Sequence, residues 1–234
     1  MFGIPAPQLD RIGTPQLIAR PWHPIPIHDN CEPLVAIPPA LLRWQPHPYQ
    51  ALGAPYPAGS NPFQLRQSVV ERLLHAQQVL RDHAEPLQLL IFDAFRPLAV
   101  QQFMVDHTRA QPGVTEEDVM ALWAEPSADP TTPPPHSTGA AVDLTLATPQ
   151  GEPLDMGGEI DAVGPIGEPN HFADADPASA EGRYHQRRCV LNQAMESAGF
   201  FRHPKEWWHF SWGDQLWAWS SGAANAHYGR SAHA

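Results

Sequence analysis

Proline is the residue that most constrains the fold of this chain, because 28 of its 234 residues are proline. The proline ring fixes one backbone angle and removes the amide donor, which excludes proline from helix interiors and central strands. We therefore expect fewer regular elements than usual, joined by long irregular connections. Residues 1–60, which proline punctuates throughout, predict loops with one or two short strands.

The rest of the composition is that of a globular chain. Hydrophobic residues make up 42% of the sequence and charged residues 17%, so enough apolar surface is available for a core. We predict one domain over residues 1–220, including the irregular start at 1–60. The last residues, 221–234, are rich in Ser, Gly, Ala and Asn and predict a flexible tail.

Charge and hydropathy exclude several classes of partner. The net charge of −11 disfavours nucleic acid and anionic membranes, since both are polyanions that recruit basic patches. No apolar run has the length of a membrane span, and the start lacks a leader pattern, so we expect a cytoplasmic protein. Cys31 and Cys189 are too few for a disulfide scaffold and are expected to be free.

Seven segments have the periodicity of regular elements. The expected helices cover about residues 65–80, 98–107, 116–123 and 184–198, and the expected strands 87–92, 141–146 and 206–212. Arg96 falls between a strand and a helix, and Asp143 on the polar face of an alternating strand. Because residues three apart on a strand face opposite sides, Glu206 is expected in a turn or bulge that leads into the strand of His209.

Two histidines and an aspartate have the chemistry of a catalytic zinc site. Such a site needs three nitrogen or oxygen ligands and one open position, where zinc lowers the pKa of water to about 7. His136, Asp143 and His209 could supply the three ligands.

Two further side chains could complete the chemistry. Glu206 is placed to take a proton from water and pass it to a leaving amine. Arg96 could hold the oxyanion that forms as water attacks a carbonyl. An alternative for Arg96 is a structural ion pair with Asp93.

Four ordered blocks carry a family resemblance. They are Asp93–Pro97, His136–Leu146, Leu154–Gly157 and Glu206–His209. Together they resemble the D-alanyl-D-alanine dipeptidases, from about residue 62 to 212.

This resemblance implies an α+β zinc peptidase fold, shared with zinc D,D-carboxypeptidases and the hedgehog signalling domain. We expect a small mixed or antiparallel sheet with helices packed on one side. By the same match, one Zn²⁺ per chain is held by His136, Asp143 and His209, while Glu206 is the catalytic base and Arg96 stabilises the transition state.

The resemblance also indicates how the substrate is held. Asp161 matches a carboxylate that binds the substrate ammonium, and Tyr49 is a further candidate for the same end. Two positions depart from the family pattern. Pro134 replaces a serine associated with the substrate carboxylate, and Phe95 replaces the more common tyrosine or tryptophan before Arg96.

The implied function is hydrolysis of the small dipeptide D-Ala-D-Ala to free D-alanine, in the turnover of cell-wall dipeptides. One alternative is a D,D- or L,D-carboxypeptidase acting on longer peptidoglycan peptides, against which a closed pocket containing Asp161 would count. An alternative of another class is a non-catalytic, metal-stabilised binding module, against which the presence of Glu206 and Arg96 argues. The sequence leaves the oligomeric state open.

Overall fold

A five-stranded sheet forms the centre of the computed structural model, which describes residues 20–232. The strands, in spatial order, are β2 (Leu42–Arg43), β4 (Gln88–Asp93), β5 (Ala141–Ala147), β7 (His209–Ser211) and β6 (Phe201–Arg202). β2 runs parallel to β4, and the other neighbours are antiparallel, so the sheet is mixed. Residues 1–19 of the predicted irregular start and residues 233–234 of the predicted tail lie outside the described residues.

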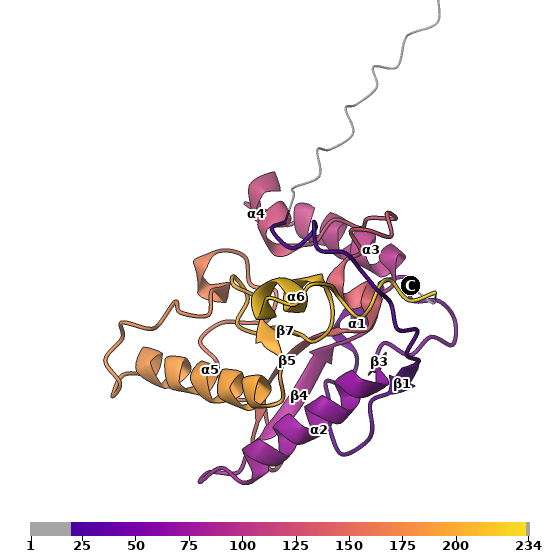
Figure 1. Cartoon of the computed structure of the whole chain (residues 1–234). Coiled ribbons are helices and arrows are strands. Elements are labelled where there is room, and N and C mark those ends of the chain that lie inside the picture. The colour runs from indigo at the N-terminus through magenta and orange to yellow at the C-terminus, as the bar shows by residue number, and fades with distance from the viewer. Residues whose placement is uncertain (1–19, 233–234) are drawn as a thin grey trace, which may run out of the picture.

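Two long helices cover one side of this sheet, as predicted. They are α2 (Gln67–Arg81) and α5 (Ala180–Ser197), which lie side by side (Figure 1). Val142, Leu144 and Leu146 alternate along β5 and belong to the same buried cluster as the apolar residues of both helices. The opposite face of β5 therefore carries Asp143 and Thr145.

A β-bulge adds a second carboxylate to this polar face. Ile91 of β4 pairs with Leu144, but Asp93 pairs with Asp143, so β4 contains one extra residue between the two pairs. In a regular ladder Asp93 would lie opposite Val142 and face the helices. Because the bulge shifts the register, Asp93 and Asp143 face the same side.

Three shorter helices form a second apolar cluster. α1 (Pro48–Ala51), α3 (Leu98–Arg109) and α4 (Glu116–Leu122) contribute buried residues to it. Figure 1 shows α3 and α4 at the opposite end of the molecule from α2 and α5. Thr115 caps α4 through a reciprocal capping box with Asp118, in agreement with the predicted start of this helix.

Several element boundaries differ from those predicted. Leu65 lies in β3 (Gln64–Arg66), which pairs with β1 (Leu34–Ala36) in a separate two-stranded sheet, so α2 begins at Gln67. The helical spacing of Leu65 arises because it joins the same core as α2. α5 begins at Ala180, where the side chain of Ser179 caps it. β7 is shorter than predicted, because the chain turns at residues 204–205 and bends at 207–208 before it.

The end of the described chain also differs from the flexible tail that the sequence predicts. After α6 (Gln215–Ser221), Ala226 forms a bridge with Ile27, and Tyr228 is fully buried with its hydroxyl bonded to Glu32. These contacts tie the end of the chain to the segment before β1. A composition of small residues gave no periodicity from which this packing could be foreseen.

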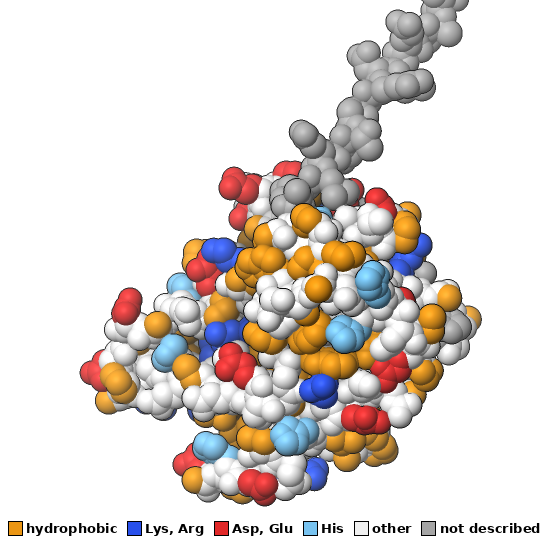
Figure 2. All heavy atoms as spheres, in the orientation of Figure 1, with side chains coloured by type: hydrophobic (Ala, Val, Ile, Leu, Met, Phe, Trp, Pro, Cys, Tyr) orange, Lys and Arg blue, Asp and Glu red, His pale blue; other side chains and the backbone are white. Residues whose placement is uncertain are grey.

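On the face of the described chain that Figure 2 shows, lysine and arginine side chains are scattered and form no basic patch. Within residues 20–232, every helix is too short or too polar to cross a lipid bilayer.

Candidate active site

The structure brings together the three side chains predicted as metal ligands. His136 lies in a short 3-10 helix, η1 (Pro135–Thr138), which follows the proline-rich loop. Asp143 of β5 is directly opposite His209 of β7. One potential ligand atom from each residue lies within 4.8 Å of the other two, and all three residues are buried.

Neighbouring groups fix which nitrogen of His136 carries the proton. Nδ1 of His136 lies 2.8 Å from the carbonyl oxygen of Ala94, and a carbonyl can only accept, so Nδ1 is the donor. Nε2 of His136 then carries a lone pair. It lies 3.2 Å from Oδ2 of Asp143 and 3.2 Å from Nδ1 of His209.

A hydrogen-bonded chain orients His209 in the same way. The hydroxyl of Ser211 donates to Asp214 at 2.7 Å, and it lies 3.3 Å from Nε2 of His209. Since the hydroxyl proton is used on Asp214, Nε2 of His209 is the donor to Ser211. Nδ1 of His209 is left with a lone pair, 3.1 Å from Oδ1 of Asp143.

These contacts make the three residues a fit for a metal ion. Two nitrogen lone pairs and a carboxylate oxygen converge, and no proton lies between them to offset their repulsion. A divalent cation would satisfy all three. Two imidazoles with one carboxylate suit zinc well, and each histidine has the outer hydrogen bond that ligating histidines usually make.

Arg96 is buried between two carboxylates of the polar face. Its Nη2 lies 2.7 Å from Oδ2 of Asp93 and 3.1 Å from Oδ2 of Asp143. Nη1 donates to Gln101 at 3.0 Å, and Nη2 also contacts the hydroxyl of Tyr49 at 3.2 Å. Arg96 therefore forms the ion pair with Asp93 that the sequence left open, and it also lines the cavity beside the three clustered residues.

Charge interactions keep two of these acids ionised. Burial opposes ionisation of Asp93, but Arg96 and a hydrogen bond with His47 lower its pKa to about 2. Burial likewise opposes ionisation of Asp143, while positive charge and hydrogen bonds from protonated rings of His136 and His209 hold its pKa below the usual value; with both rings neutral, a bound cation would have the same effect. Asp143 is therefore available as an anionic ligand.

Glu206 lies in the turn before β7, as predicted, and not on the strand itself. Its Oε2 is 3.7 Å from Nδ1 of His209, and its Oε1 is 3.3 Å from Nδ1 of His203. The turn thus brings Glu206 to the side of the sheet that His209 faces. Burial raises the pKa of Glu206 well above the usual value, and the negative charges of Asp143 and Asp161 raise it further.

The two predicted substrate-binding residues contact each other. The hydroxyl of Tyr49 donates to Oδ2 of Asp161 at 2.8 Å. Asp161 has a left-handed backbone with a φ of 64°, which turns its side chain into the cavity. Burial and the charge of Asp143 raise the pKa of Asp161 to about 7, against the opposing effect of Arg96.

Sequence reasoning missed several neighbours of the site. Hydrogen bonds from or to His47, Gln101 and Asp214 hold Asp93, Arg96 and Ser211, respectively, in place. All three of these neighbours lie outside the four motif blocks, so the motifs did not point to them. Ser211 was detectable, because strand alternation puts it on the face of His209.

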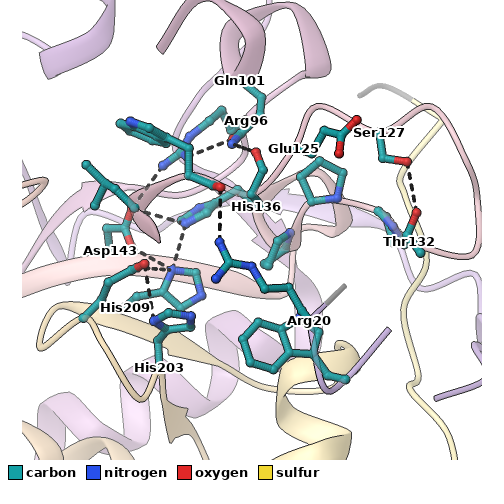
Figure 3. Close-up of a pocket in the computed structure, with 18 of the residues that line it drawn as sticks. Arg20, Arg96, Gln101, Glu125, Ser127, Thr132, His136, Asp143, His203 and His209 are labelled. Carbon is teal, nitrogen blue, oxygen red and sulfur yellow. Dashed lines mark hydrogen bonds and ion pairs between the residues drawn. The ribbon is translucent and has the colours of Figure 1, made fainter. Parts of the chain in front are cut away.

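The three clustered residues line one small cavity of about 60 Å³, together with Arg96, Asp161 and Glu206. Figure 3 shows His136, Asp143 and His209 pointing toward one another, with Arg96 on one side and Arg20 reaching in from another. A family model described as D-ala-D-ala dipeptidase matches residues 60–228, which include the three clustered residues His136, Asp143 and His209 together with Arg96, Asp161 and Glu206. The chain belongs to the D-ala-D-ala dipeptidase family. It is therefore a metallopeptidase.

Individual family relatives agree with this assignment. A D-alanyl-D-alanine dipeptidase of Synechocystis sp. is 45% identical over 239 residues, which cover 90% of this chain and 96% of the relative. A D-alanyl-D-alanine dipeptidase of Escherichia coli K12 is 33% identical over 125 residues, or 53% of this chain and 54% of the relative. The solved structure of the LdcB LD-carboxypeptidase is a more distant match, 17% identical, with a TM-score of 0.42 over 78% of this chain and 70% of that chain.

Proposed function

We propose that this chain hydrolyses the dipeptide D-Ala-D-Ala to free D-alanine, with one Zn²⁺ held by His136, Asp143 and His209. The observation that carries the proposal is the convergence of two nitrogen lone pairs and one carboxylate within 4.8 Å at the floor of a cavity. When bound, the ion supplies Lewis-acid chemistry, which polarises a carbonyl and lowers the pKa of water. The remaining steps fall to side chains of the protein.

Glu206 is the proposed general base and acid. Its carboxyl lies beside His209 without taking part in the cluster of converging ligand atoms. It accepts a proton from the attacking water and returns it to the amine nitrogen of the leaving D-alanine.

Arg96 is the proposed stabiliser of the oxyanion. Its guanidinium is fixed by Asp93 and Gln101, so no reorganisation is needed when charge develops on the carbonyl oxygen. The ion pair with Asp93 is thus compatible with a catalytic role, since it helps to fix the second N–H group of Nη1, which has no partner among the described residues.

Asp161 is the proposed partner of the substrate's free ammonium group. The hydroxyl of Tyr49 holds the Asp161 carboxylate in the cavity. In this arrangement Tyr49 positions Asp161, and the carboxylate makes the ionic contact.

The cavity supports a dipeptide more than a longer peptide. Asp161 lines the cavity, and a carboxylate there pairs with a free amine at the position from which a longer peptide would continue. This observation counts against the carboxypeptidase alternative. The presence of both Glu206 and Arg96 in the cavity counts against a non-catalytic binding module. A cytoplasmic location and a role in the turnover of cell-wall dipeptides stay predictions from the sequence.

The deciding experiment measures release of free D-alanine from D-Ala-D-Ala and from a tripeptide that ends in D-Ala-D-Ala, with and without a chelator. Chelator-sensitive cleavage of the dipeptide with little cleavage of the tripeptide supports the proposal. Preference for the tripeptide would favour the carboxypeptidase. A zinc-loaded protein that cleaves neither would favour the binding module.

A further inference from the structure

Arg20 reaches the cavity from a segment far from the family motifs. It precedes β1 in the chain and lines the same cavity as His136 and Asp143. Figure 3 shows its side chain pointing toward the side chains of His136 and His209. Nη2 of Arg20 donates to the carbonyl oxygens of Met120 and Trp123, at 2.7 and 3.3 Å, which fixes the guanidinium in place.

The charge of Arg20 is not matched by an ion pair, although the Glu206 carboxyl attracts it from beyond ion-pair distance. Among residues 20–232, no carboxylate oxygen lies within 4.0 Å of its guanidinium, whereas the buried Arg96 contacts two carboxylates. Within the same part of the chain, Nε and Nη1 of Arg20 donate no hydrogen bond. A half-buried cation with two free donor groups is costly unless an anion arrives to satisfy it.

The other groups on this side of the cavity are poor partners for an anion. Pro133, Pro134 and Pro135 line it and have neither a side-chain donor nor an N–H group. The hydroxyls of Ser127 and Thr132 lie 3.0 Å apart and bond to each other, which leaves only one of their two protons for a ligand. Arg20 is therefore the donor best placed to meet a negative group there.

A zwitterionic dipeptide supplies such a group. Its ammonium end is assigned to Asp161, so its carboxylate lies at the other end of the bound molecule. We propose that Arg20 binds the C-terminal carboxylate of the substrate and selects peptides in which that carboxylate is free. This inference rests on the proposed function, because it concerns the same substrate in the same cavity. A guanidinium with two free N–H groups suits a carboxylate, which accepts two parallel hydrogen bonds.

The test compares two substrates that differ only in this charge. Values of kcat/KM are measured for D-Ala-D-Ala and for D-alanyl-D-alaninamide, whose C-terminus is neutral, with the full-length, zinc-loaded protein. The variants are Arg20→Met, which removes the charge, and Arg20→Lys, which keeps it. Arg187→Met is the matched control, because Arg187 also donates to a backbone carbonyl, that of Asp155, but does not line the cavity.

The expected result is a loss of discrimination. The ratio of kcat/KM for the free acid to that for the amide should fall on the order of 10- to 100-fold in Arg20→Met, the usual effect of a hydrogen bond to a charged group. Arg20→Lys should recover part of the ratio, and Arg187→Met should keep all of it. If Arg20 had a purely structural role, Arg20→Met would lower kcat/KM equally for both substrates.

Three outcomes are decisive. An unchanged ratio in Arg20→Met would overturn the assignment of Arg20, even if both activities fell. If Arg20→Met does not fold, Arg20→Gln and Arg20→Lys are compared with the wild type instead. The same acid-to-amide ratio of kcat/KM in all three proteins would overturn the assignment as well. Failure of the wild-type protein to cleave D-Ala-D-Ala would instead overturn the proposed function, which separates the two claims.

Discussion

Tyr49 and Asp161, 112 positions apart in the chain, share a hydrogen bond of 2.8 Å. Tyr49 is buried in α1, and its hydroxyl also accepts from Arg96 at 3.2 Å. The same phenol thus links the proposed ammonium-binding carboxylate to the proposed oxyanion-binding guanidinium. Two substrate contacts depend on one side chain of a short helix.

The raised pKa of Asp161 predicts pH-dependent substrate binding. Burial and Asp143 raise this pKa to about 7, so the carboxyl is protonated below that pH and cannot pair with an ammonium group. A bound cation favours the ionised form and moves the midpoint lower. Affinity for D-Ala-D-Ala should therefore fall as the pH drops through this midpoint, measured by calorimetry on an inactive Glu206→Gln protein. In the Asp161→Asn/Glu206→Gln protein the affinity should be weak and nearly independent of pH; a flat profile in the parent would contradict the role of Asp161.

Ser211 is predicted to tune metal affinity through His209. Its hydroxyl lies 3.3 Å from Nε2 of His209 and donates to Asp214, which sets the imidazole tautomer. Ser211→Ala should weaken zinc binding about 10- to 100-fold, as loss of such outer hydrogen bonds does elsewhere. Competition with a chromogenic chelator measures the change. Ser197→Ala is the control, because the Ser197 hydroxyl bonds only to a helix carbonyl, and an equal loss there would refute the argument.

Substitutions of Glu206 and His209 are predicted to have different effects, loss of turnover in the first case and loss of the metal in the second. Glu206→Gln should lower kcat by at least about 10²- to 10⁴-fold, the contribution of a general base, while zinc stays bound. His209→Ala should lose the metal, because one of the three converging ligand atoms is removed. Metal analysis of the purified proteins alongside kcat checks both. Wild-type turnover in Glu206→Gln would exclude it as the base.

Local patterns predicted the elements of the fold that carry the site. The alternation of β5 placed Asp143 on the polar face, and the geometry of a strand required Glu206 to lie in a turn before β7. Contacts between distant segments were not predictable in this way. The β-bulge that turns Asp93 toward Asp143 depends on the pairing of two strands, which periodicity within either strand does not encode.

The proline-rich start and the small-residue end were the least predictable parts for the same reason. Arg20 is held at the cavity by hydrogen bonds to backbone carbonyls near the end of α4, about 100 positions away in the chain. Tyr228 is buried against residues that precede β1. Neither segment has a periodicity that reveals its partner, because its contacts are single side chains and not an amphipathic face.

The packing of Tyr228 predicts that the end of the chain contributes to stability. Its ring is fully buried and lies 5.8 Å from that of Trp212, between centroids, while its hydroxyl bonds to Glu32. Tyr228→Ala should lower the free energy of unfolding by about 3 kcal/mol, the usual cost of removing a large buried ring. Tyr228→Phe should cost only about 1 kcal/mol, because the ring stays and Ser68 still donates two hydrogen bonds to Glu32. Urea unfolding with saturating zinc measures both values. If Tyr228→Ala unfolded at the wild-type midpoint, residues 222–232 would not be part of the cooperative fold, and the flexible tail predicted from composition would be restored.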